Sequence, residues 1–134
     1  MRRFLLTAAT AATALVGTAC SDVTGIGDSV AGSYELIRVN GQSLPADDIS
    51  GELTFYTGVL ELNRDGEFVD LIQYRVPGDP RIYDSQVFGT WERSGNDIRL
   101  EYDDSGFVAF AERPSSSRLI VEDEFGNRLE YRRF

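Results

Sequence analysis

The residue types that carry out most protein chemistry are scarce in this chain. Its 134 residues include no His and a single Cys, Cys20. The lack of His excludes Ser-His-Asp and Cys-His catalysis and zinc sites with His ligands. One Cys can form neither an intrachain disulfide nor a paired thiolate site. We therefore expect a protein that is not an enzyme, with no catalytic residues, no cofactor and no metal.

Carboxylates are plentiful, but their spacing matches no known site. Acidic pairs or runs occur in turns or at strand ends, at 47–48, 103–104 and 122–124. None has the spaced Asp/Asn pattern of an EF-hand calcium loop. Paired carboxylates can cleave glycosides, but nothing in the sequence selects such a pair. We interpret these residues as solvated turns.

Asp70 differs, because it interrupts an apolar run and shares a face with Phe68, Ile72 and Tyr74. Isolated buried carboxylates are costly. One interpretation is therefore a polar position near a bulge, at a barrel mouth or on the outer face. The other is a carboxylate with a raised pKa inside a cavity.

Four aromatic residues are candidates for lining a cavity: Phe68, Tyr74, Trp91 and Tyr102. Trp91, the only tryptophan, either packs in the core as a barrel-end plug or faces a ligand in the mouth of a barrel. A small eight-stranded barrel is either filled by its own side chains or holds one small ligand. The sequence does not choose between these.

These residues lie on short β-rich runs separated by turn residues, which is typical of an all-β barrel or sandwich. Asn40-Gly41 ends the first run, Asp65-Gly66 predicts a tight hairpin, and a shift of alternation near Thr57-Gly58 predicts a bulge. Short connections favour an antiparallel up-and-down meander, and closing it into a barrel removes exposed edges. The eight expected strands are 33–39, 52–63, 67–76, 86–93, 97–102, 107–112, 118–123 and 128–134.

The beginning of the chain has the pattern of a secretory signal peptide. Two Arg precede an apolar run, 4–16, which is shorter than the roughly 20 residues of a transmembrane helix, and small residues then lead to Cys20. With Thr18 and Ala19 before Cys20, this segment resembles the signal peptide of bacterial lipoproteins. The resemblance implies cleavage before Cys20, a diacylglyceryl group on its sulfur and a membrane anchor of acyl chains such as palmitate.

The residues around Cys20 bear on localisation. Ser21, rather than Asp, follows the cysteine, so the resemblance implies the cell envelope, at the periplasmic face of the outer membrane. Gly17 stands where that family usually has Leu, and 17–19 also fits ordinary signal cleavage. The alternative is a secreted soluble protein.

We expect three segments: a signal peptide, 1–19, a lipidated N-terminus with a flexible tether, 20–31, and one domain, 32–134. All 13 basic residues are Arg, and without the two in the signal peptide, 11 Arg face 22 acidic residues, a net charge of −11. This acidity argues against nucleic-acid partners.

Loose motifs run along the domain: Tyr34-Glu35-Leu36 before Asn40-Gly41, the run 58–62 through Asp65-Gly66 to Phe68, Gly89-Thr90-Trp91, and the Gly95 turn before Ile98 and Leu100. With these motifs the domain resembles the lipocalin-like barrels of small bacterial lipoproteins. The resemblance implies a tethered barrel that binds a small apolar or amphipathic, lipophilic ligand. The alternative hypothesis is a filled barrel whose loops, such as 77–85, contact an envelope protein partner or inhibit it.

Overall fold

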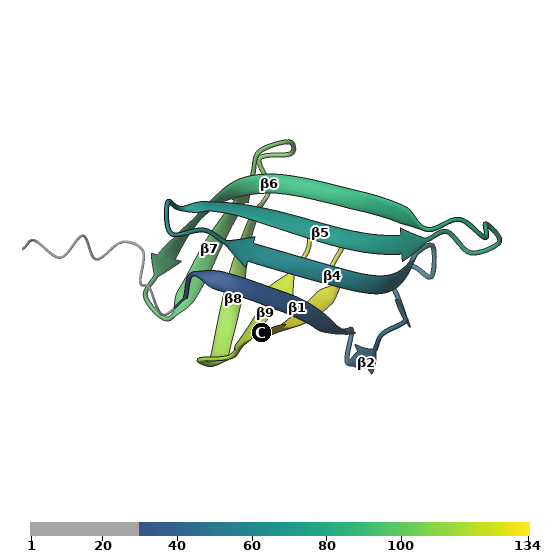
Figure 1. Cartoon of the computed structure of the whole chain (residues 1–134), viewed down its shortest axis with the longest axis horizontal. Helices are drawn as coiled ribbons and strands as arrows, with labels where there is room; N and C mark the ends of the chain where they lie inside the picture. The colour runs from purple at the N-terminus through teal and green to yellow at the C-terminus, as the bar shows by residue number, and fades with distance from the viewer. Residues whose placement is uncertain (1–29) are drawn as a thin grey trace, which may run out of the picture.

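The computed structural model describes residues 30–134, so Cys20 and the predicted signal peptide lie outside the described residues. Within this range the chain forms a single ten-stranded antiparallel sheet (Figure 1). No helix in the described range is long and apolar enough to cross a membrane. The strands are β1 (Gly32–Val39), β2 (Gln42–Ser43), β3 (Ala46–Asp47), β4 (Thr54–Leu62), β5 (Glu67–Arg75), β6 (Tyr83–Ser94), β7 (Asp97–Tyr102), β8 (Val108–Ser115), β9 (Arg118–Glu122) and β10 (Arg128–Arg133).

The sheet closes into a barrel through β1. This strand pairs with β10 along its length and with β4 over its first half, from Gly32↔Leu62 to Glu35↔Val59. Each strand from β4 to β10 pairs with the next along the chain. The predicted fold class, an antiparallel up-and-down meander closed into an eight-stranded barrel, is confirmed, and the short β2 and β3 are additions that the sequence did not predict.

Two local signals in the sequence have clear structural outcomes. Asn40 and Gly41 both have positive φ, 52° and 81°, as a two-residue β-hairpin turn of type I′ requires. The predicted bulge lies in β4, where the register with β5 shifts between Phe55 and Thr57. Before the shift Phe55 faces inward, and after it the inward residues are the even-numbered ones, including Leu60.

Other expectations needed correction. Asp65-Gly66 lies in the β4–β5 hairpin as predicted, but among the described residues only Asn40 and glycines have positive φ, so Asp65 does not share that conformation. Pro114 lies between the expected strands 107–112 and 118–123, in a stretch predicted as their connection, whereas β8 continues past it with a register shift between Glu112 and Ser115. Val30 and Ala31, which belong to the segment predicted as a flexible tether, are both buried.

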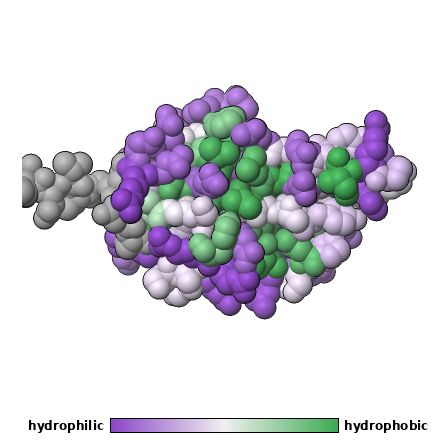
Figure 2. Space-filling view, in the orientation of Figure 1, coloured by the Kyte–Doolittle hydropathy of each residue, from purple (hydrophilic) through white to green (hydrophobic). Residues whose placement is uncertain are grey.

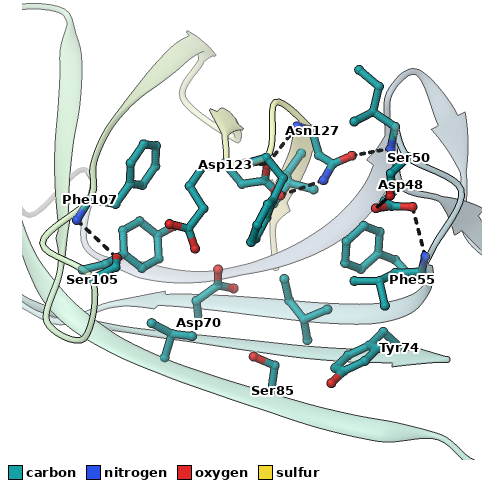
Figure 3. A pocket seen from close by; sticks show the side chains of 18 of the residues that line it. Asp48, Ser50, Phe55, Asp70, Tyr74, Ser85, Ser105, Phe107, Asp123 and Asn127 are labelled. Carbon is teal, nitrogen blue, oxygen red and sulfur yellow. Dashed lines mark hydrogen bonds between the residues drawn. The ribbon is translucent and has the colours of Figure 1, made fainter. Parts of the chain in front are cut away.

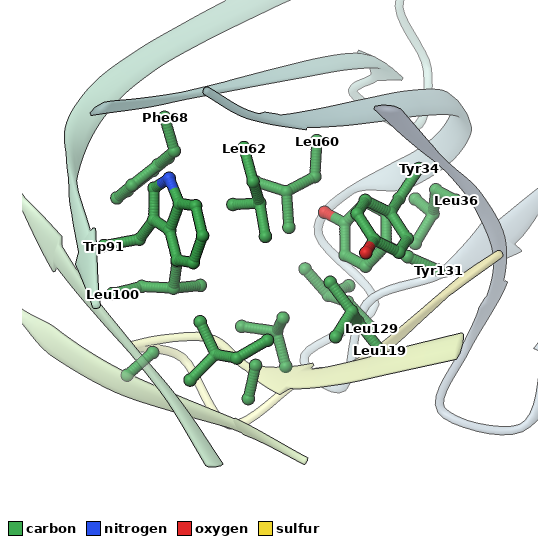
Figure 4. Close-up of a cluster of buried hydrophobic side chains, with 14 of the residues drawn as sticks. Tyr34, Leu36, Leu60, Leu62, Phe68, Trp91, Leu100, Leu119, Leu129 and Tyr131 are labelled. Atoms are coloured by element: carbon green, nitrogen blue, oxygen red, sulfur yellow. The ribbon is translucent and has the colours of Figure 1, made fainter. Parts of the chain in front are cut away.

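The core fills the end of the barrel at which the chain enters. Trp91, Phe68, Leu62 and Leu100 point into the interior of the barrel (Figure 4), on the parts of their strands that lie towards the β4–β5 and β6–β7 turns.

Gly89 makes this packing feasible. A Cβ atom at Gly89 would lie 2.4 Å from Cε1 of Phe68 and 2.1 Å from the Glu101 carbonyl oxygen, far inside van der Waals contact. Only a residue without a side chain lets the Phe68 ring lie against β6.

The outer face of the barrel is mostly polar, with scattered apolar side chains. Leu71 on β5 and Phe88 on β6 are both exposed, and Figure 2 shows apolar surface among hydrophilic residues over these two strands. Their inward-facing neighbours, Asp70 and Val87, line the opposite side of the sheet. Successive side chains along each strand thus point alternately to the outer face of the barrel and to its interior.

Candidate functional site

A cavity of about 710 Å³ occupies the end of the barrel opposite the β4–β5 turn, next to the packed core (Figure 3). Its wall comes from the inner face of β4, β5, β6, β7 and β10 and from the connections β3–β4, β7–β8 and β9–β10. Half of its lining residues are apolar or aromatic, and the rest are polar or acidic. The lining consists of Asp48, Ile49, Ser50, Glu52, Leu53, Phe55, Asp70, Ile72, Tyr74, Ser85, Val87, Tyr102, Asp104, Ser105, Phe107, Asp123, Glu124, Phe125, Asn127 and Leu129.

Tyr102 forms the boundary between cavity and core. The rings of Tyr102 and Phe68 meet edge to face, with centroids 5.0 Å apart, and Tyr102 also packs against Phe107 at 5.9 Å. Edge-to-face contacts of this kind add stability beyond the buried area. Tyr102 therefore lines the cavity, whereas Phe68, which is 1% exposed, belongs to the core beneath it.

Trp91 is a core residue, as one of the two interpretations of the sequence expected. Its indole Nε1–H donates a hydrogen bond of 2.8 Å to the carbonyl oxygen of Asn63, at the β4–β5 turn. The backbone amide of Trp91 donates to Gly66 in the same turn. Trp91 thus plugs the closed end, and it is not among the residues that line the cavity.

Asp70 is the buried carboxylate of the site. It faces inward from β5, is 7% exposed, and its Oδ1 accepts a hydrogen bond of 3.2 Å from the hydroxyl of Tyr131 on β10. Figure 3 shows its carboxylate pointing into the cavity from the strand that forms the floor. The second interpretation of Asp70, a carboxylate inside a cavity, is the one that the structure supports.

Burial has a direct electrostatic consequence for Asp70. It raises the pKa of Asp70 from 3.8 to about 7, against a smaller lowering by the Tyr131 hydrogen bond. The negative charge of Asp123 also raises this pKa. Burial, and then Asp70 itself, raise the pKa of Tyr131 and of Tyr102, so both phenols remain neutral hydrogen-bonding groups at ordinary pH.

Asn127 fixes the loops around the mouth, and sequence reasoning did not identify it. It is 1% exposed, and its Oδ1 accepts hydrogen bonds from the Ile49 amide at 2.7 Å and from Nδ2 of Asn40 at 3.1 Å. Its own Nδ2 donates to Oδ2 of Asp123 at 2.9 Å. These bonds join the β9–β10 loop to the loops that follow β1 and β3.

The loop between β3 and β4 is ordered by Asp48. Its Oδ2 accepts a 2.6 Å bond from the Ser50 hydroxyl, and its Oδ1 accepts a 3.0 Å bond from the Leu53 amide. Partial burial raises the pKa of Asp48, but these hydrogen bonds outweigh it and the pKa is lowered overall. Asp48 therefore keeps its charge at the mouth.

The rim of the cavity carries exposed apolar side chains. Ile49 and Phe125, which both line the cavity, are 67% and 71% exposed. Exposed apolar groups at the entrance of a polar-rimmed hollow are typical of ligand sites.

Tyr74 lines the cavity and also holds the β5–β6 loop. Its ring stacks on Tyr83 at 5.6 Å, and the Tyr83 hydroxyl donates a 2.7 Å bond to Asp79. In the loop expected to contact a partner, 77–85, Ile82 is exposed, whereas Tyr83 is half-buried by this stacking.

The four aromatic candidates therefore divide into two groups. Tyr74 and Tyr102 line the cavity, whereas Phe68 and Trp91 pack in the core. The barrel is neither wholly filled nor wholly hollow: one end is packed and the other is open. Cys20, the predicted lipid anchor, lies outside the described residues.

No protein-family model matches the chain, and no curated protein matches it. Among solved structures, it is similar to a lipocalin-like protein from Bacteroides uniformis, with a TM-score of 0.48 and 18% identity over 79% of this chain and 99% of that one. The fold class rests on the strand order of this chain itself.

Proposed function

We propose that this protein is an envelope lipoprotein that binds one small amphipathic molecule in the open end of its barrel. The observation that carries the proposal is the cavity itself. Its volume, about 710 Å³, lies within the roughly 300–1,000 Å³ of small-molecule sites. Half of its lining residues are apolar or aromatic, and the Asp70 carboxylate points in among them; small-molecule sites likewise combine apolar side chains with placed polar groups.

The proposed attachment to the membrane rests on the sequence around Cys20. A signal-peptide pattern that ends in the only cysteine of the chain supports acylation of that residue. Two or three acyl chains suffice for stable anchoring, since each buried methylene contributes about 0.8 kcal/mol.

Native mass spectrometry tests ligand binding directly. The protein from residue 21 onward, exported to the periplasm, should carry a reproducible extra mass that denaturation removes. Ser85 faces the cavity, and Gln86, the next residue on β6, faces outward beside Leu71. Ser85→Trp should abolish the extra mass by filling the cavity, whereas Gln86→Trp should retain it.

Two results would count against the proposal. If both tryptophan variants keep the same extra mass, the ligand lies outside the cavity. If the wild-type protein shows a bare polypeptide mass and binds no added amphiphile, the open end does not serve as a small-molecule site.

A further inference from the structure

The charges around the cavity are all of one sign. Six of its lining residues are acidic, and none is Arg, although the chain contains 13 Arg. An aqueous mouth lined by one sign of charge concentrates ligands of the opposite sign and repels those of the same sign. Fatty acids and phosphate-bearing lipids are therefore disfavoured. The acidic residues are Asp48, Glu52, Asp70, Asp104, Asp123 and Glu124.

Among residues 30–134, Asp70 is the buried acidic group of the cavity, and it lacks a cationic partner. Within residues 30–134, none of the ion pairs involves Asp70. Its one hydrogen bond, from the neutral Tyr131 hydroxyl, engages Oδ1 only. A buried carboxylate without a counter-charge is costly. Either a proton or a cation in the cavity can neutralise it.

Among residues 30–134, no cationic group is found to act on Asp70. Its partners on the neighbouring strands are Leu60 on β4 and Val87 on β6. The titratable groups that act on it or respond to it from β7, β10 and the β9–β10 loop are neutral phenols or an acid: Tyr102, Tyr131 and Asp123.

The rest of the wall is suited to hydrocarbon and to cations. Phe55, Ile72 and Phe107 supply apolar surface beside the carboxylate, and Tyr74 and Tyr102 supply aromatic rings. Organic cations gain further attraction from aromatic faces. A bare metal ion is a poor fit, because no group of three or more metal-ligating side chains occurs within residues 30–134.

We propose that the cavity binds amphipathic organic cations, with the cationic group against the Asp70 carboxylate and the hydrocarbon part against the apolar wall. This inference rests on the proposed ligand-binding function and adds the charge of the ligand. The ligand class is a hydrophobic amine or quaternary ammonium compound.

Three probes with the same ten-carbon chain test the charge preference by calorimetry at about pH 8. They are decyltrimethylammonium, decanol and decanesulfonate, whose charges do not change near neutral pH. The cation should bind about tenfold or more tightly than decanol, because the attraction between a cation and a buried, unpaired carboxylate is worth at least this much. The sulfonate should bind more weakly than decanol.

Asp70→Asn removes the charge and keeps the shape and the oxygen that accepts from Tyr131. This variant should lose the preference for the cation, about tenfold, and bind decanol as well as the wild type does. Asp97→Asn, the same change at an exposed position in the β6–β7 hairpin, should keep the preference.

The outcomes separate the two proposals. If decanol binds in the cavity but the cation gains nothing, or if Asp70→Asn keeps the cation preference, the charge inference is wrong and the binding function stands. If none of the three probes binds, the binding function fails, and the charge inference fails with it.

Discussion

Asp70 should make the folded protein less stable as the pH rises from acid to neutral, and Asp70→Asn should remove this dependence. In the folded state the pKa of Asp70 is about 7, and its ordinary value is 3.8. Between these two values the folded protein holds a proton that the unfolded chain has released. Stability is therefore fully present below about pH 4, falls as the pH rises to about 7 and is then constant.

The size of the effect follows from the two values. The slope is about 1.4 kcal/mol per pH unit, so the difference between 3.8 and about 7 corresponds to about 4 kcal/mol. Small domains have a free energy of unfolding of about 5–15 kcal/mol. One carboxylate thus controls a large fraction of the stability.

Urea unfolding of the ligand-free protein, followed by the fluorescence of the buried Trp91, measures this effect. The difference in unfolding free energy between wild type and Asp70→Asn should change by about 4 kcal/mol between about pH 4 and pH 8, in favour of the variant at the higher pH. Ser85→Ala changes another cavity-facing side chain without removing a titratable group and should keep the wild-type profile. An equal difference at both pH values would refute the assignment of Asp70 as a buried, proton-holding carboxylate.

Further measurements test other parts of the structure. Affinity for decyltrimethylammonium should rise about tenfold from pH 6 to pH 8, because the ionised fraction of Asp70 rises through its pKa of about 7; a flat profile in the wild type would contradict the charge inference. Gly89→Ala should destabilise the barrel by about 3 kcal/mol or more, since the new methyl group overlaps Phe68 and the backbone of β7. An unchanged midpoint of thermal unfolding would show instead that the core rearranges to accept the methyl group. Asn127→Ala should cost about 3 kcal/mol by leaving buried partners unpaired, and amide hydrogen exchange should rise at Ile49; unchanged protection there would show that Asn127 does not hold the mouth loops. Cys20→Ser should release the protein from the membrane fraction, and a variant that is processed normally and stays membrane-bound would rule out the anchor.

Much of the fold could be predicted because the signals are local. Alternation along each strand and the Asn40-Gly41 turn depend on residues close in sequence. The bulge in β4 was visible as a shift of the apolar positions from odd to even. These signals fix the strands, and short connections then fix their order. The β2 and β3 pairings, of two residues each, are too short to leave such a pattern.

The site was harder to predict because it depends on contacts between distant segments. Asp70 was noticed on the face of Phe68, Ile72 and Tyr74, but its partner Tyr131 lies 61 residues away, so the pattern left both a cavity position and a surface position open. Aromatic type alone could not separate Tyr102, at the cavity, from Trp91, in the core. Asn127 gave no signal, since its partner Asn40 is 87 residues distant.

Because one end of the barrel is open and the other is packed, the two ends also determine where a ligand would enter and leave. The chain enters beside the β4–β5 turn, where Gly32 pairs with Leu62, and the mouth is formed by connections at the other end. If Cys20 holds this protein to a bilayer, the chain is tethered from its sealed end and the opening is the end remote from the tether. If the protein also binds a ligand as we propose, that ligand would enter and leave at the end of the barrel opposite the tether.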